Sequence, residues 1–528
     1  MMRRLALIGP ACLLAWAMPA CAISLTIATA SDPQTMDPHS LALKYQTQIA
    51  FTIYEPLVGR DQDFHAAPVL ATDWSRVDPL TWRFRLRPGV RFHDGSPFTA
   101  ADAVFSLQRA MSPPSQRQYL LKGIKSVREV DPLTIDLAMS EPDMALPQKL
   151  ELVAMMSKRW SQAHHVERAQ DFNARQETFA VRNANGTGAY RLERYEPDIR
   201  TTLKAFAQWW NRKSAENGNV DVVTFATIRS DATRLAALHS GEVDVVLDPP
   251  YQDVDSLGRD PSLALTKVGE IATDYLTFDQ ASEALPGVAP GPGGKPRNPF
   301  KDVRVRRAVY DAINIDLVIQ KVLKGLATPT GDLLPPDAGA SAPSVAVRPR
   351  YDPLQARTLL REAGYPDGFD VTMDCVNVTY REHVCQAMAA MLTQAGIRAH
   401  LRTSPSHQFF PMVTEGKASL IEFGFTGASE DPWQGLNGLL HTWDGKGGGT
   451  FNAGRYSNPR LDTLIDAIRV EHDPARLHAL VADALRIAVD DVAYVPLYRH
   501  TLSWVMQKKV HVVMLPDDTI PVRWVVVR

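Results

Sequence analysis

The chain has 528 residues, with 57 lysines and arginines against 59 aspartates and glutamates, so its formal net charge is −2. Such a balance excludes a protein that coats nucleic acid through a basic surface. A content of 45% hydrophobic and 22% charged residues excludes an acidic disordered chain and predicts a globular protein. At roughly 150 residues each, about three to four domains fit this length.

The first 22 residues have the pattern of a secretory signal. Arg3 and Arg4 form a basic start, residues 5–18 are apolar, and residues 20–22 (A-C-A) form a cleavage site. The apolar stretch is too short to span a bilayer comfortably. We therefore expect export to the periplasm with Ile23 as the mature N-terminus. A lipid anchor on Cys21 is the alternative, and the residues before this cysteine match a lipoprotein signal poorly.

The segment Thr81–Arg87 alternates strictly between apolar residues and arginines or threonine, which predicts a half-buried strand. Its three arginines would suit an anion-binding patch, but a solvated strand face is the favoured interpretation. Further on, Thr99 and Asp102 have the spacing of a capping box. This box predicts the start of a helix.

Later helices are indicated by Asx-Pro pairs, in which the first residue can cap the helix and proline takes its first position. These pairs are Asp352-Pro353, Asn458-Pro459 and Asp473-Pro474. Residues 302–325 predict two helices joined at residues 314–316. Short β-rich segments lie between helices, at Val243–Leu247, Tyr275–Phe278 and Val492–Tyr498. The alternation of strands and helices predicts an α/β architecture.

No catalytic or cofactor-binding motif is complete in the sequence. Gly427–Asp431 fails as a G-x-S-x-G elbow at its last position, and no H-E-x-x-H motif occurs. The glycine-rich segment Gly445–Thr450 lacks the spacing of a phosphate-binding loop. We therefore expect a protein that is not an enzyme and that holds no cofactor. A secreted hydrolase stays open as a distant alternative.

Only two cysteines, Cys375 and Cys385, lie outside the signal. In an oxidising compartment such a pair favours a disulfide over two free thiols. His383 lies nearby, but two cysteines and one histidine at this spacing make no recognisable zinc site. We expect no metal.

Nine segments, in order along the chain, resemble one family. They are Ser31–Pro38, Tyr54–Leu57, Thr81–Leu107, Gly186–Leu192, Ser240–Asp244, Pro299–Arg306, Leu359–Phe369, Phe451–Asp462 and Tyr494–Tyr498. The family is that of the extracytoplasmic solute-binding proteins of ABC importers, which includes dipeptide-, oligopeptide- and nickel-binding members. Residues 373–391 also resemble a segment that carries a disulfide in this family. The resemblance extends over nearly the whole mature chain.

The resemblance implies a type II periplasmic-binding fold, a clamshell of two lobes with an extra subdomain on the first. We expect residues 23–53, 184–279 and 496–528 in lobe I, residues 54–183 in the extra subdomain and residues 280–495 in lobe II. The chain would cross between lobes near Asp279 and near residues 494–498. Closure on a solute, followed by docking on a membrane permease with its ATPase, needs no covalent chemistry. Nucleic acid is not an expected partner.

The resemblance also indicates where a ligand's amino end would bind. In peptide-binding members an aspartate, three residues after an aromatic residue, receives the α-ammonium of the ligand. Here Phe425 matches the aromatic residue, Thr426 is its neighbour, and Ala428 takes the place of the aspartate. Glu430 or Asp431 could substitute for it. Alternatively, both only cap the turn at residue 432.

Other expected lining residues are Asp32, Tyr275, Trp443 and Tyr498. For each aromatic residue, burial in the core is the alternative. The expected ligand is a peptide or a peptide-like solute. A non-peptide solute such as an opine, a sugar or a metal chelate stays open, because this fold does not fix the ligand.

Overall fold

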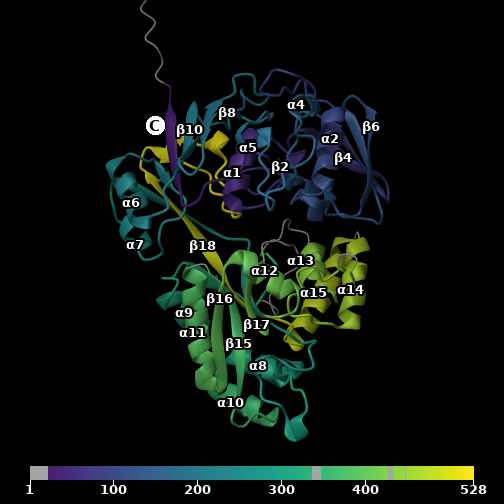
Figure 1. Cartoon of the computed structure of the whole chain (residues 1–528), viewed down its shortest axis with the longest axis vertical. Helices are drawn as coiled ribbons and strands as arrows, with labels where there is room; N and C mark the ends of the chain where they lie inside the picture. The colour runs from purple at the N-terminus through teal and green to yellow at the C-terminus, as the bar shows by residue number, and fades with distance from the viewer. Residues whose placement is uncertain (1–21, 336–346, 378, 426–431, 446–447, 472) are drawn as a thin grey trace, which may run out of the picture.

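The computed structural model describes residues 22–335, 347–377, 379–425, 432–445, 448–471 and 473–528. It has two lobes, and the long strand β18 (Val495–Gln507) runs from one into the other (Figure 1). We call the upper part of Figure 1 lobe I and the lower part lobe II. The predicted α/β architecture is confirmed, since strands and helices alternate along most of the chain.

Half of a mixed sheet forms the centre of lobe I. Its strand order is β18-β11-β1-β10-β9-β8, with β12 also paired with β18. β1 runs parallel to β10, and its apolar residues Leu25 and Ile27 are buried. The strands are β1 (Ser24–Thr29), β8 (Tyr190–Glu196), β9 (Arg200–Ala205), β10 (Val222–Thr227), β11 (Val245–Val246) and β12 (Leu263–Gly269), and the helices are α1 (Lys44–Ile53), α6 (Asp231–Ser240) and α7 (Val254–Leu257). The C-terminal strands β19 (Val510–His511) and β20 (Val526–Val527) form a separate pair.

A four-stranded antiparallel sheet, in the order β4-β5-β7-β6, forms an extra subdomain beside lobe I. β5 (Thr81–Leu86) confirms the predicted half-buried strand, and its arginines pair with acidic neighbours, Arg83 with Asp136 and Arg85 with Asp73. The predicted capping box opens α2 (Ala100–Met111). The other elements are β2 (Val58–Arg60), β3 (Ala66–Pro68), β4 (Ala71–Asp78), β6 (Ile124–Asp131), β7 (Thr134–Met139), α3 (Leu146–Lys149), α4 (Lys158–Ala163) and α5 (Phe179–Arg182).

Lobe II contains the other half of the large sheet, in the order β16-β15-β17-β13-β18, with β14 also on β18. Its strands are β13 (Thr273–Phe278), β14 (Ala327–Pro329), β15 (Phe369–Val376), β16 (Ile397–Ser404) and β17 (Leu420–Phe425). Its helices are α8 (Val303–Asp311), α9 (Ile315–Lys321), α10 (Pro353–Glu362), α11 (Thr379–Ala395), α12 (Ser406–Thr414), α13 (Pro432–Leu439), α14 (Pro459–Val470) and α15 (Pro474–Asp490). Short 3-10 turns lie at Gln118–Leu121, Leu150–Leu152, Pro292–Gly294, Pro299–Lys301 and Val522–Trp524.

The three Asx-Pro helix starts are confirmed. The side chains of Asp352, Asn458 and Asp473 each accept hydrogen bonds from backbone N–H groups in the first turn of α10, α14 and α15. Residues 302–325 form the two expected helices, and Asn314 caps the second. These starts depend only on local hydrogen bonding, which is why the sequence pattern predicts them.

Two segments connect the lobes. β18 pairs with β12 through Thr501–Gln507, and with β13 through Val495, Pro496 and Tyr498. The chain therefore passes from lobe II to lobe I within β18, after His500, which still pairs with Ala327 of β14 in lobe II. It also passes between the lobes at residues 270–272, between β12 and β13, which is upstream of the expected crossing near Asp279. The lobe boundaries given above stay a prediction.

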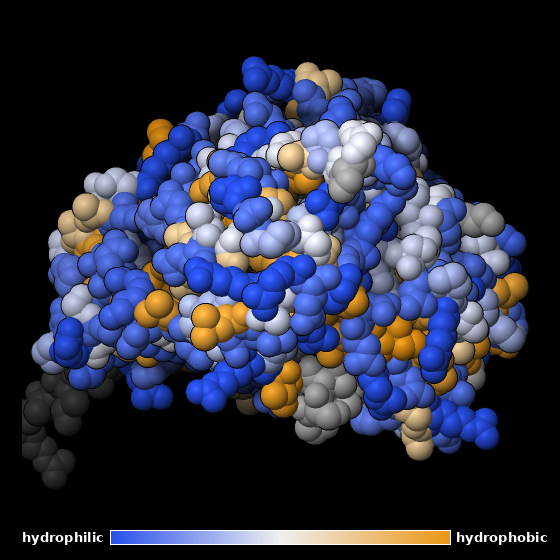
Figure 2. Space-filling view, turned by 90° about the horizontal axis from the view of Figure 1, so that it is seen from below, coloured by the Kyte–Doolittle hydropathy of each residue, from blue (hydrophilic) through white to orange (hydrophobic). Residues whose placement is uncertain are grey.

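Seen from below, the molecule is mostly hydrophilic, with apolar residues in several separate patches (Figure 2). In the part of the chain that the structure describes, no helix has both the length and the apolar character needed to cross a bilayer.

Candidate functional site

A buried cluster of charged side chains lies where the connecting strands meet α11. Arg381 of α11 donates hydrogen bonds to Asp274 of β13 and to Glu422 of β17, with 2.6 Å between its Nη1 and Glu422 Oε1. Nε2 of His500, on β18, lies 2.8 Å from Oδ2 of Asp274. Both carboxylates are buried. The guanidinium of Arg381 thus holds β13 and β17 against α11, and β18 joins the cluster through the His500–Asp274 contact.

The cluster shifts the titration of its two acids in opposite directions. Burial raises the pKa of Glu422 to about 7, although the charge of Arg381 opposes the shift. Burial would also raise the pKa of Asp274, but Arg381 and His500 hold it below its usual value. Asp274 therefore stays ionised at neutral pH, whereas Glu422 gains or loses its proton near neutral pH.

Tyr275 and Tyr498 lie beside this cluster and are fully buried. The Tyr275 ring meets Tyr494 edge-on, with 5.0 Å between centroids, and the Tyr498 ring meets His500 at 5.0 Å. Neither hydroxyl has a hydrogen-bond partner within the described part of the chain. The structure thus brings these two predicted residues together at the connection between lobes, inside the core.

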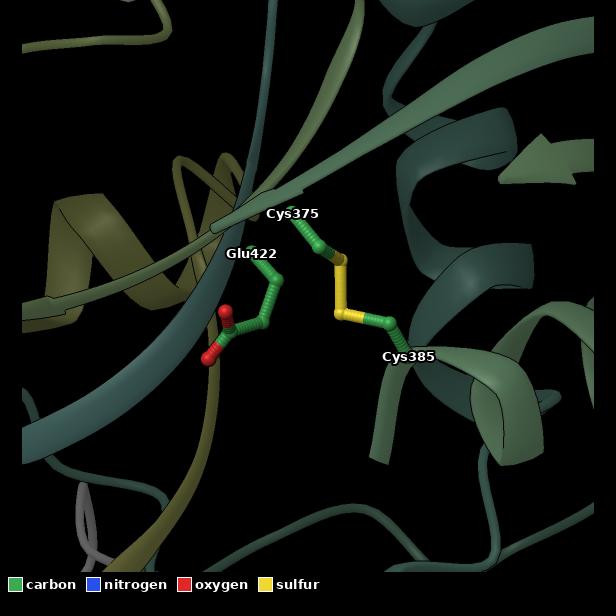
Figure 3. Close-up of side chains that lie close together, drawn as sticks. All are labelled: Cys375, Cys385 and Glu422. Atoms are coloured by element: carbon green, nitrogen blue, oxygen red, sulfur yellow. A yellow bond between two sulfur atoms is a disulfide. The ribbon is translucent and has the colours of Figure 1, made fainter. Parts of the chain in front are cut away.

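The predicted disulfide is confirmed. Cys375 is the last residue but one of β15, Cys385 lies on α11, and the bond joins them next to Glu422 (Figure 3). The two sulfurs and a carboxylate oxygen of Glu422 lie within 4.8 Å of one another. Because both sulfurs are in the disulfide, they are not thiolate ligands. The bond instead anchors α11 one turn after Arg381.

A cavity of about 550 Å³ lies in lobe I, between α1, the β2–β3 hairpin and the C-terminal segment. One face of α1 lines it, at Lys44, Thr47, Gln48, Phe51 and Thr52. The other walls include Arg117, Tyr119, Trp209, Trp210, Leu515 and residues 519–524, and the acidic residues Glu55, Asp61, Glu151, Glu216 and Asp517 also line the cavity. Ile271, in the first connecting segment, also lines the cavity, so the cavity reaches the connection between lobes.

The basic residues of this cavity differ in how their charge is balanced. Arg60 pairs with Glu151 at 2.6 Å, and Lys44 pairs with Asp248 at 3.0 Å. Arg117, only 2% exposed, has no carboxylate partner among the residues that the structure describes.

The Arg117 side chain donates to Thr47 Oγ1 at 2.9 Å and to the Leu41 oxygen at 3.4 Å, while its Nε is without an acceptor among described residues. Burial lowers the pKa of this guanidinium. Arg523, the fourth basic residue, stacks on Trp524 and donates to the backbone oxygen of Arg60 at 3.4 Å.

The remaining predicted residues are dispersed. Asp32 is buried in lobe I and accepts hydrogen bonds from Tyr195 Oη at 2.6 Å and from the Gln34 backbone at 3.1 Å. Phe425 packs against Phe451 in a core of lobe II. Trp443 is 60% exposed. Thr426, Ala428, Glu430 and Asp431 lie outside the described residues.

Sequence reasoning missed Arg117, Lys44 and the Arg381 cluster. Arg117 directly precedes the 3-10 segment Gln118–Leu121 between α2 and β6, and no motif marks it. Glu422 does leave a signal, because it is a charge inside the otherwise apolar strand Leu420–Phe425. A charged residue in a buried strand implies a buried partner.

Three comparisons place the chain among known proteins. Residues 65–447 match the family model for the bacterial extracellular solute-binding proteins, family 5 (middle). The glutathione-binding protein GsiB of Salmonella typhi is 29% identical over 497 residues, covering 91% of this chain and 90% of GsiB. GsiB of Escherichia coli K12 is 28% identical over 498 residues, with the same coverage of 91% and 90%.

A solved structure, the periplasmic binding protein DppA of Helicobacter pylori with the peptide STSA, has a TM-score of 0.78 at 23% identity and covers 96% of this chain and 98% of its own. A second, AgaA of A. tumefaciens R10 with agropinic acid, has a TM-score of 0.76 at 20% identity and covers 96% and 99%. These likenesses establish the fold as that of periplasmic binding proteins, as the sequence resemblance implied.

Proposed function

Because the chain belongs to family 5 of the bacterial extracellular solute-binding proteins, we propose that it captures a peptide or peptide-like solute for an ABC importer. It works in the periplasm, closes its lobes on the solute and delivers it to a membrane permease with its ATPase. It carries out no covalent reaction. The naming of its relatives as glutathione-binding proteins supports a short peptide with free carboxylates as the ligand.

The burial of Arg117 without a carboxylate partner among the described residues is the observation that supports an anionic ligand. A guanidinium that is buried without a counter-charge is costly. A carboxylate that reaches it would form a charge-assisted and potentially bidentate pair. The cavity beside Arg117 therefore suits the carboxylate end of a peptide, and its aromatic walls, Trp209 and Trp210, suit apolar side-chain surface. We infer that the ligand is anionic where it enters lobe I.

Two measurements test this function. Mass spectrometry of the natively purified protein identifies the retained solute, and calorimetry measures glutathione binding. Removing a hydrogen-bonded charge costs about 1.5–3 kcal/mol, so Arg117→Gln should weaken binding by about tenfold to a hundredfold. Arg128→Gln, which alters an exposed ion pair on β6, is the matched control and should leave binding unchanged.

The diethyl ester of glutathione, which lacks both carboxylates, should bind as weakly to the wild type as glutathione does to Arg117→Gln. Equal affinity for glutathione and its diester would contradict an anionic ligand. A retained solute without any peptide bond would favour the alternative, a non-peptide ligand. AgaA, a protein of this fold, was solved in complex with agropinic acid, so the fold accommodates a non-peptide solute.

A further inference from the structure

The extra subdomain and lobe II touch across the space between lobes. Glu141 follows β7 in the extra subdomain, and Arg469 lies in the last turn of α14 in lobe II. Arg469 Nη2 donates to Glu141 Oε2 at 2.9 Å, and the two residues are 328 positions apart in the sequence. This ion pair therefore joins parts of the chain that no local structure holds together.

Trp433 of α13 forms a second contact at the same place. Its ring lies 5.6 Å from Nζ of Lys149, which ends α3 in the extra subdomain. On its own lobe it lies 6.0 Å from Cζ of Arg469. A tryptophan face attracts a cation at these distances. The Trp433 ring thus contacts Lys149 of the extra subdomain and Arg469 of lobe II.

The extra subdomain's half of this contact is held in place by its own residues. Lys149 Nζ lies 2.7 Å from Asp143 Oδ2, and the two side chains are only 13% and 9% exposed. A cation fixed by an ion pair inside its own subdomain loses little freedom when Trp433 arrives. The Arg469 side chain is 22% exposed and the Glu141 side chain 57% exposed, so water screens this pair and its strength is that of a surface ion pair.

The contact lies away from the strands that connect the lobes, so movement of one lobe relative to the other breaks it. In Figure 1, α13 and α14 lie under the extra subdomain, to the right of β18. A rotation about β18 and residues 270–272 therefore separates Glu141 from Arg469 and Lys149 from Trp433. Such a rotation leaves the buried Asp274–His500 pair intact, because both strands of that pair extend into lobe II.

We propose that Glu141, Lys149, Trp433 and Arg469 form a closure latch, by which the extra subdomain holds lobe II against lobe I. The latch acts on the equilibrium between open and closed forms, and so on how long a solute stays bound. The effect of the latch on a bound solute rests on the function proposed above. The closure itself does not depend on which solute binds.

Distances between spin labels test the latch without any ligand. Ser126→Cys on β6 and Thr463→Cys on α14 place labels at exposed positions of the extra subdomain and lobe II. Double electron–electron resonance then gives the ratio of closed to open molecules at low salt. Arg469→Gln and Glu141→Gln should each lower this ratio by up to about fivefold, the range expected for one screened ion pair, while the Lys149–Trp433 contact stays in place.

The double variant should be no more open than either single variant, because both remove the same contact. Arg486→Gln, which breaks an exposed pair with Asp483 on α15, is the control and should leave the ratio unchanged. Distance distributions identical in wild type and Arg469→Gln would overturn the latch. Fully additive effects of the two single variants would overturn it as well.

A second readout uses glutathione as the probe. In Arg469→Gln its dissociation rate should rise by the same factor as the closed population falls, with little change in the association rate. If wild type does not bind glutathione, the proposed ligand fails, while the ligand-free distances still decide the latch. If glutathione binds but leaves Arg469→Gln and wild type at equal rates, the latch does not control retention.

Discussion

His500 and Asp274 tie together the two strands that connect the lobes, with Nε2 of one 2.8 Å from Oδ2 of the other. Arg381 then fastens Asp274 to α11. The lobe II ends of both connecting strands are therefore part of the rigid body of lobe II. We expect bending to occur beyond them, at residues 270–272 and in β18 after His500.

The first prediction concerns Arg381. In Arg381→Met two buried carboxylates, Asp274 and Glu422, lose their shared cation, and breaking a buried ion pair in this way costs about 3–5 kcal/mol. Urea denaturation should show that loss in the free energy of unfolding. The control is Arg398→Gln, which removes a pair with Asp370 on the open side of β16 and should cost about 0–1 kcal/mol.

The triple variant Arg381→Met, Asp274→Asn, Glu422→Gln should regain part of the loss, because it removes the stranded charges as well. Equal stabilities of Arg381→Met and Arg398→Gln would show that the cluster is not a structural centre.

The second prediction concerns pH. Burial raises the pKa of Glu422 to about 7, from 4.5. Between these values the folded protein keeps a proton that the unfolded chain has lost. Stability therefore falls as pH rises from about 4.5 to about 7, on the order of 3 kcal/mol for this group.

Glu422→Gln should flatten this part of the pH profile of unfolding. It should not flatten it completely, because burial also raises the pKa of Glu270 to about 7. Glu415→Gln, at an exposed pair with Lys417, is the control. A Glu422→Gln profile that keeps the wild-type slope between pH 4.5 and 7 would refute the buried-acid explanation.

Local features of the fold were accessible from the sequence, whereas the charged cluster was not. The cap at Asn458 involves the next few residues only, so the pattern of those residues is sufficient to predict it. Arg381 meets partners 41 and 107 positions away, and no local pattern encodes such a meeting. The resemblance located Tyr275 and Tyr498 at the lobe connection, but their full burial depends on packing between strands distant in sequence.

The third prediction concerns the disulfide. Cys375 and Cys385 close a short loop, so their bond should contribute about 2–3 kcal/mol to stability. Replacing both with alanine should lower the free energy of unfolding by that amount and should also loosen the start of α11, where Arg381 lies. Hydrogen exchange would report the second effect as faster exchange in α11 than in α15. Unchanged hydrogen exchange in α11 would show that the disulfide does not hold the part of α11 that carries Arg381.

The fourth prediction concerns the mature chain. The A-x-A site at residues 20–22 predicts an exported protein that begins at Ile23 and carries no lipid. Its intact mass should equal that of residues 23–528 less two hydrogens for the disulfide, and alkylation without reductant should add nothing. A diacylglycerol adduct on Cys21 would instead identify a lipoprotein.

The last prediction concerns the amino end of the ligand. The sequence resemblance implies that Ala428 takes the place of an aspartate found in peptide-binding members, and its methyl group cannot accept a hydrogen bond from an ammonium. An unpaired ammonium in a closed, dry cleft costs several kcal/mol. We therefore expect a relaxed requirement at this end, so that glutathione and N-acetylglutathione differ in affinity by less than about tenfold, or roughly 1.4 kcal/mol, in calorimetry. A loss on the order of a hundredfold on acetylation would instead reveal a replacement anchor, and Glu430→Gln and Asp431→Asn would then identify it: the anchor's variant alone should bind both compounds equally.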